Sequence, residues 1–209
     1  MQKSRVITAV LRLIYIVVGR MPVGDRCKCI LCGRSVRCFV PYRGGKAFVP
    51  PLQMELKTVG SDRDNFECPF CGCHDRERHA YMYLSRLGMI EGWASQRILH
   101  FAPEHQLRRL IGELAPVEYV LADLNPIDAH ISCINIENIP FQDEYFDMII
   151  ANHVLEHVQN VQIALNEIYR CLKPGGMALL QTPFSKALVS TLEDPGIKTP
   201  IARLHAYGQ

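Results

Sequence analysis

Two short cysteine motifs stand in the first part of the chain. Cys29 and Cys32 form one C-x-x-C motif, Cys68 and Cys71 form the other, and a glycine follows each. Such a turn brings two thiolates to one point, and the glycine lets backbone N–H groups approach the sulfurs. Two turns together provide the tetrahedral four-thiolate geometry of structural zinc. The spacing therefore predicts a Zn²⁺ site held by these four cysteines.

Neighbouring residues leave the ligand set open, because Cys27, Cys73 or His74 could replace one of the four. The alternative is a disulfide framework. It is disfavoured because the chain has nine cysteines, an odd number, and no convincing secretory signal precedes them. We therefore expect reduced thiols and a cytoplasmic location.

Polar residues in the second half follow short apolar segments. Asp123 ends one segment about 20 residues after the turn at 101–105, where a carboxylate could accept both ribose hydroxyls of an adenosine. Asn135 and Asn152 stand near the ends of two further segments. In an open parallel sheet, ligands bind beyond the carboxyl ends of the strands. This layout indicates a ligand that contains adenosine, without specifying which one.

The elements that would position these residues alternate between strands and helices. Short apolar runs predict strands at 97–101, 119–122, 132–136, 146–151 and 177–181. Helical spacing predicts helices at 76–87, 106–114 and about 153–172, the last with a break near Gln159 and Asn160 and a stop at 173–176. This alternation predicts an α/β fold with a doubly wound parallel sheet and helices on both faces.

The N-terminal segment is apolar. Residues 6–18 contain one charge, at Arg12, and are too few to span a bilayer. Residues 19–22 do not resemble a signal-peptide cleavage site. We expect a helix packed on the body of the protein, and the alternative is a helix in contact with a membrane surface.

Composition limits the remaining function classes. The 209 residues are 48% hydrophobic and 21% charged, with a formal net charge of +2, which excludes an intrinsically disordered chain. The near-neutral balance gives no clear nucleic-acid signature. No G-x-G-x-x-G follows the first expected strand, which disfavours a nicotinamide-dependent dehydrogenase.

Three segments in the second half, in their order and spacing, resemble class I S-adenosylmethionine-dependent methyltransferases of the type 11 kind. They are 139–147, 153–158 and 167–176. Upstream, 98–104 resembles a bacterial subgroup with an A-P-E turn in place of the usual glycine-rich loop, and 68–79 matches the zinc knuckle of that subgroup. The resemblance covers roughly residues 27–195 and implies a Rossmann-like fold with a small zinc-ribbon-like region.

The resemblance implies S-adenosylmethionine as cofactor. It also assigns positions around this cofactor to the residues that follow the first two strands. Ala102, Pro103 and Glu104 form the turn beside the methionine part, and Asp123 takes the ribose position. The usual glycines of this turn are missing, and His100 stands where many relatives have an acidic residue.

The remaining strand-end residues are assigned in the same way. Asn135 and Ile136 stand where the family places its adenine clamp, and Asn152 and His153 line the pocket near the reactive methyl group. His153 is the candidate catalytic base, required only where the acceptor nucleophile is protonated at neutral pH.

The implied function is methyl transfer to an unidentified acceptor such as a small molecule or a glycan. The rival interpretation is a non-catalytic zinc-knuckle binding protein whose second half is a degenerate methyltransferase scaffold. The expected domains are an apolar helix at 1–26, a zinc-knuckle region at 27–75 and a methyltransferase domain at 76–209.

The methyltransferase fold is expected to be incomplete. A class I sheet usually continues past its fifth strand, whereas Leu192–Pro195 and Leu204–Gly208 look like a loop and a short helix. An uncovered sheet edge is an aggregation hazard. Either the chain is truncated, or a partner or the N-terminal helix covers this edge.

Overall fold

The chain divides into two compact units. One comprises Met1–Asp75 with Pro183–Gln209, and the other comprises Arg76–Thr182. The computed structural model describes residues 2–22, 27–43, 45, 49 and 51–190. The segments predicted as a loop and a short helix, Leu192–Pro195 and Leu204–Gly208, lie outside the described residues.

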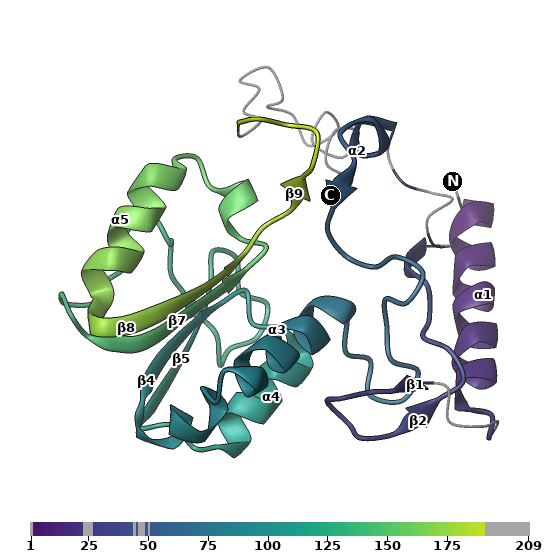
Figure 1. Cartoon of the computed structure of the whole chain (residues 1–209), viewed down its shortest axis with the longest axis horizontal. Helices are drawn as coiled ribbons and strands as arrows, with labels where there is room; N and C mark the ends of the chain where they lie inside the picture. The colour runs from purple at the N-terminus through teal and green to yellow at the C-terminus, as the bar shows by residue number, and fades with distance from the viewer. Residues whose placement is uncertain (1, 23–26, 44, 46–48, 50, 191–209) are drawn as a thin grey trace. The chain divides into compact units, whose positions relative to one another are not determined.

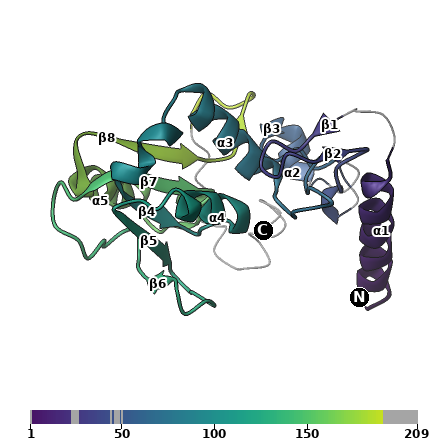
Figure 2. The same ribbon diagram turned by 90° about the horizontal axis from the view of Figure 1, so that it is seen from below.

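The unit Arg76–Thr182 is built on a five-stranded parallel sheet with the order β6-β5-β4-β7-β8 (Figure 2). The strands are β4 (Arg97–Phe101), β5 (Glu118–Asp123), β6 (Ser132–Cys133), β7 (Phe146–Asn152) and β8 (Leu172–Gln181). The chain builds outward from β4 through β5 to β6, then returns to add β7 and β8 on the other side of β4. The strand order therefore reverses between β4 and β7, and the predicted parallel α/β sheet is confirmed.

Helices cover both faces of this sheet (Figure 1). The helix α5 (Val161–Cys171) packs on one face, and α3 (Asp75–Arg86) and α4 (His105–Glu113) pack on the other. Two 3₁₀ turns, η2 (Ile90–Ser95) and η3 (Leu155–His157), complete the unit.

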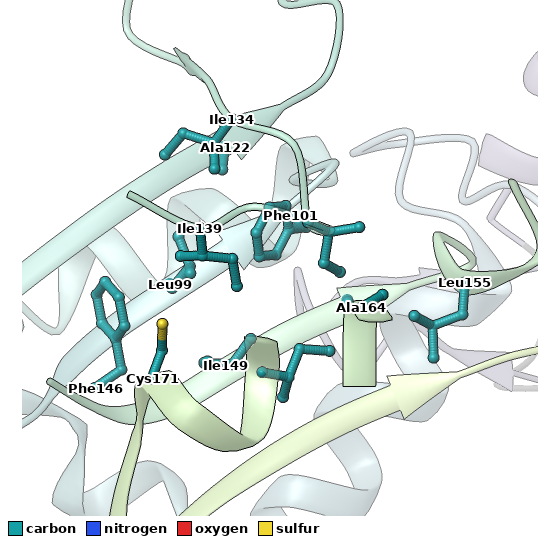
Figure 3. Packing of buried hydrophobic residues seen from close by; sticks show 13 residues of the cluster. Leu99, Phe101, Ala122, Ile134, Ile139, Phe146, Ile149, Leu155, Ala164 and Cys171 are labelled. Carbon is teal, nitrogen blue, oxygen red and sulfur yellow. The ribbon is translucent and has the colours of Figure 1, made fainter. Parts of the chain in front are cut away.

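Alternating side chains along the buried strands supply the two cores. Leu99 and Phe101 of β4 face α5, where they join Ala164 in one cluster (Figure 3). Ile98 faces the other way and packs with Leu107 of α4 in the second cluster. Both faces of the strand are thus buried, as a parallel sheet requires.

Most predicted boundaries differ from the structure by one residue or less, and three differ by more. The third strand ends at Cys133, and the helix expected from 153 is divided into η3 and α5. The predicted break is confirmed, because the side chain of Asn160 caps α5 by accepting the N–H of Ile163 at 3.2 Å. The last strand begins at Leu172 instead of 177, since Leu172 already pairs with Phe146 and a register shift follows.

The unit of Met1–Asp75 with Pro183–Gln209 has few regular elements. They are α1 (Gln2–Arg20), β1 (Cys27–Lys28), β2 (Ser35–Val36), α2 (Pro51–Glu55), β3 (Thr58–Val59) and β9 (Phe184–Ser185). The strand β9 was not predicted, and it pairs with β3 instead of extending the five-stranded sheet. Among the described residues, no helix has the length and apolar character needed to cross a membrane.

Gly176 allows β8 to pass close to the start of β7. A Cβ at this position would lie 2.9 Å from the carbonyl oxygen of Lys173 and 3.1 Å from that of Asp147. Because backbone atoms cannot swing aside, we expect Gly176→Ala to lower the free energy of unfolding by about 1–3 kcal/mol. Urea denaturation measures the change.

Gly112→Ala in α4 is the matched control. Its added methyl group meets nothing within 4 Å, and alanine favours a helix over glycine. A Gly176→Ala protein as stable as the wild type would contradict the proposed close approach.

Candidate functional site

Three of the predicted cofactor residues come together at the carboxyl edge of the sheet. Phe101 pairs with Ala122 on one side and with Ala151 on the other. The next residues along the three strands, Ala102, Asp123 and Asn152, therefore emerge side by side. The edge is the topological switch point, where doubly wound sheets bind their ligands.

The backbone is strained on both sides of the switch point. Ala102 has a φ of 45° and His153 a φ of 55°, a left-handed conformation that costs a residue other than glycine about 1–2 kcal/mol. Hydrogen bonds hold both residues in place: the N–H of Ala102 donates to Ala122 O and that of His153 to Gln181 O, each at 2.8 Å. The first turn thus keeps a glycine-like backbone without a glycine. Strain of this kind gathers at functional sites.

Glu104 belongs to a buried polar network beneath this turn. Its Oε2 lies 3.2 Å from Nε2 of His100 and accepts a hydrogen bond of 3.5 Å from Nδ2 of Asn152. The other ring nitrogen of His100 lies 2.8 Å from the hydroxyl of Tyr119. Burial raises the pKa of Glu104, but the hydrogen bond and charge of His100 outweigh it and hold this pKa below its usual value. The carboxylate is therefore ionised at neutral pH.

A different carboxylate caps the following helix. The side chain of Glu104 makes no capping hydrogen bond to α4. Instead, Oε1 of the buried Glu77 accepts the N–H groups of Gln106 and Leu107, at 2.8 and 3.1 Å. Glu77 thus satisfies the free N–H groups at the start of α4 and leaves Glu104 to the candidate site.

Two buried acceptors at the edge have no partner among the residues that the structure describes. They are Oδ1 of Asn152 and Oε1 of Gln181, from residues paired across β7 and β8. An unsatisfied buried acceptor costs about 1–3 kcal/mol. The pair therefore fits a ligand that brings N–H or O–H donors, such as the ammonium group of S-adenosylmethionine. Gln181 was not predicted as a site residue, although it ends the last predicted strand and the rule about strand ends applies to it as well.

His153 lies outside any helix, directly after β7. Its Nδ1 lies 3.1 Å from Oε1 of Glu156, and both side chains are largely buried. A carboxylate on one ring nitrogen orients the imidazole and leaves Nε2 for proton transfer.

The remaining predicted cofactor residues contact their own loops or the core. Asp123 is half-buried and accepts the N–H of Asn125 at 2.8 Å. Asn135 is exposed and accepts the N–H of Glu137 at 2.9 Å. Ile136 is buried, and its side chain belongs to the core cluster on the α5 face.

A surface hollow of about 330 Å³ lies elsewhere, beside α4 and β5. Its two arginines are paired, Arg108 with Asp128 and Arg109 with Glu113. None of the predicted cofactor residues lines the hollow, so it is not the candidate site.

In the other unit, the cysteines predicted from spacing come together. The sulfurs of Cys29, Cys32, Cys68 and Cys71 all lie within 4.8 Å of one another, with two pairs at 3.9 Å. Zn–S bonds of about 2.3 Å place tetrahedral sulfurs about 3.8 Å apart, so the cluster has the right size for zinc.

Both knuckles have the same backbone geometry. Gly33 and Gly72 have φ values of 68° and 74°, and each donates its N–H to the carbonyl of the first cysteine of its motif, at 2.8 and 2.9 Å. A left-handed residue at this point explains why glycine follows each motif.

Crowding of the thiols shifts their acidity. Hydrogen bonds from Cys29 and Cys73 lower the pKa of Cys68 to about 3, while burial raises the pKa of Cys71 to about 12. Cys73 lies close as well, with its sulfur 3.4 Å from that of Cys29. Because zinc binds thiolates, a divalent cation bound by these cysteines would displace their protons.

The network around Glu104 predicts a pH-dependent stability. Because its pKa is lower in the folded protein than its ordinary value of 4.5, ionised Glu104 stabilises the fold above about pH 4.5, and this contribution disappears as the pH falls through the folded pKa. We expect Glu104→Gln to cost about 1–3 kcal/mol at pH 7 and progressively less in acid, measured by urea unfolding across pH.

Glu113→Gln, at the end of the helix that follows Glu104, is the control. Glu113 is 56% exposed, so its substitution should leave the pH profile unchanged. A constant difference between the wild type and Glu104→Gln at every pH would exclude the ionised network.

Part of the chain is similar to known methyltransferase domains. Residues 98–180 match the family model described as a methyltransferase domain. The ubiquinone/menaquinone biosynthesis C-methyltransferase UbiE of Yersinia enterocolitica is 38% identical over 100 residues, which covers 40% of this chain and 39% of that protein. UbiE of Yersinia pestis is 37% identical with the same coverage. The match thus spans 39% of the length of these relatives.

Solved structures also match part of the chain. The YcgJ protein of Bacillus subtilis has 22% identity and a TM-score of 0.40, covering 47% of this chain and 50% of its own. An S-adenosylmethionine-dependent methyltransferase from Mesorhizobium loti has 16% identity and a TM-score of 0.40, with coverages of 50% and 54%.

Proposed function

Because residues 98–180 match the model of a methyltransferase-domain family, we propose that this protein transfers a methyl group from S-adenosylmethionine to an acceptor molecule. The main support for the proposal is the arrangement of residues at the carboxyl ends of β4 and β7. There the family's cofactor positions coincide with a strained backbone and with unsatisfied buried acceptors.

The residues of this edge have the chemistry that the cofactor needs. The turn of Ala102, Pro103 and Glu104 lies beside the methionine part, and the Asp123 carboxylate accepts the ribose hydroxyls. Asn152 offers its unpaired Oδ1 to the ammonium group. By the resemblance, Asn135 and Ile136 stand on the adenine side of the site, although the side chain of Asn135 accepts the N–H of Glu137 and that of Ile136 lies in the core.

The protein's contribution to the reaction is positioning and exclusion of water. When bound, S-adenosylmethionine supplies an electrophilic methyl group on its sulfonium. The buried carboxylate of Glu104 and the left-handed turn at Ala102 keep the backbone in place at the carboxyl end of β4, where the reactants bind. His153, oriented by Glu156, takes a proton at Nε2 from an acceptor nucleophile that carries one.

We assign the acceptor to small molecules. This rests on the curated relatives, whose names place them in ubiquinone and menaquinone biosynthesis. A glycan acceptor remains the alternative, and competition between acceptors of the two classes in a methyl-transfer assay separates them.

Cofactor binding tests the proposal directly. Isothermal titration with S-adenosylhomocysteine should show saturable binding, weakened about tenfold or more by Asp123→Ala, which removes the acceptor for the ribose hydroxyls. Asp123→Asn should also weaken binding because it loses the charge while retaining an acceptor for the loop N–H.

Asp128→Ala is the matched control. Like Asp123, Asp128 accepts a loop N–H two residues later, from His130 at 2.9 Å, but it stands within the loop between β5 and β6 and is paired with Arg108. Binding by this variant should equal that of the wild type. The absence of any binding by the wild type at millimolar ligand would favour the rival interpretation, a non-catalytic zinc-knuckle protein on a methyltransferase scaffold.

We also propose that the cysteine cluster binds one structural Zn²⁺ through Cys29, Cys32, Cys68 and Cys71. The support is the size of the cluster and the matched geometry of its two knuckles. Bound zinc would hold together a unit whose described strands contain only two residues each.

Elemental analysis of the purified protein should give about one zinc per chain. Cys32→Ser should lose the metal, whereas Cys73→Ser and the exposed Cys133→Ser should retain it. Retention by Cys32→Ser together with loss by Cys73→Ser would show that Cys73 is the fourth ligand. A metal-free, folded wild type would refute the site.

A further inference from the structure

One side of α1 is held against its own unit. Nε of Arg12 donates to Oε2 of Glu67 at 3.1 Å, and the carbonyl of Gly19 accepts the N–H of Arg37 at 3.0 Å. Gly19 is buried, and a Cβ there would lie 2.7 Å from the carbonyl oxygen of Cys38. Arg12 and Gly19 therefore mark the side of the helix that faces the unit.

The opposite side of α1 is an uncovered apolar stripe. At 100° per residue, Val10, Leu13, Ile14 and Val17 fall within one arc of about 100°, roughly opposite Arg12 and Gly19. These four side chains are between 51% and 61% exposed. Leu11 and Tyr15 extend the exposed surface at one margin. The expectation of a helix packed on the body thus holds for one side of α1 only.

The charges around the stripe are of one sign. The helix α1 contains four basic residues, Lys3, Arg5, Arg12 and Arg20, and no acidic residue. Residues 1–75 contain twelve Lys and Arg against six Asp and Glu, a net charge of +6, although the whole chain carries only +2. Zinc held by four thiolates would reduce this to a net of +4, still strongly basic. An apolar stripe with basic residues at both ends complements an anionic lipid surface.

We propose that α1 docks this protein on anionic membranes, with the apolar stripe of Val10, Leu13, Ile14 and Val17 inserted at the headgroup boundary. The net positive charge of residues 1–75 attracts the lipid phosphates, while Arg12 remains paired with Glu67 and Arg20 donates from Nε to the carbonyl oxygen of Pro69 at 2.7 Å. This interaction is independent of the methyl-transfer site.

Charge repulsion argues against a second copy of the chain as the partner that covers the apolar stripe. Two α1 helices packed stripe to stripe would bring basic ends together in either orientation, since the helix carries no acidic residue to pair with them. Lipid phosphates satisfy the same charges without repulsion.

Vesicle flotation tests the proposal. The intact protein is mixed with vesicles of phosphatidylcholine alone or with about 30% phosphatidylglycerol. It should float with the anionic vesicles and much less with the neutral ones, and high salt should weaken its binding. Leu13→Glu with Val17→Glu should reduce binding to the anionic vesicles about tenfold or more, because two charges are placed in the stripe.

Ile127→Glu with Val189→Glu is the matched control, since it replaces two fully exposed apolar residues outside α1. It should bind like the wild type, and circular dichroism should show that both double variants are folded. Equal binding by the two double variants, or no binding by the wild type, would overturn the proposal. A dimer in light scattering that the α1 variant converts to a monomer would identify a second copy as the occupant and overturn it as well.

Discussion

Parallel pairing of β4 with both of its neighbours is the constraint on which the candidate cofactor site depends. Phe101 lies opposite Ala122 and Ala151, so the three strands end together and their following residues share one edge. Burial of β4 on both faces fixes this register. The same rigidity allows Ala102 and His153 to remain in left-handed conformations, since packed strands on each side determine where the chain must leave the sheet.

Glu77 connects the segment after the second knuckle to this edge. Glu77 accepts the first N–H groups of α4. Glu104 therefore does not need to cap the helix, and its carboxylate contacts His100 and Asn152 instead. Although position 100 is a histidine in this chain, an ionised carboxylate is still present beside the end of β4. Glu104 thus supplies a negative charge where the resemblance places the methionine part of the cofactor, although His100 replaces the acidic residue of many relatives.

The two units are stabilised by different means. The unit Arg76–Thr182 buries apolar side chains on both faces of a sheet. In the unit that contains α1, the fully buried positions include Cys29, Cys68 and Cys73, and the strands are short. A small unit with little core needs a further source of stability, and the proposed thiolate-bound zinc would provide one. The exposed stripe of α1 adds nothing to the core, which is consistent with a role in docking.

The sequence by itself determined the parallel α/β sheet, the helix break at Asn160 and the four-cysteine cluster, because local spacing of residue types indicates each of them. It could not determine that β8 begins at Leu172 or that β9 pairs with β3, since strand pairing joins residues distant in the chain. Only the tertiary structure decided which carboxylate caps α4, which acceptors remain unpaired and which side of α1 is uncovered. Local spacing gives the faces of an element, whereas burial and hydrogen-bond partners depend on what packs against those faces.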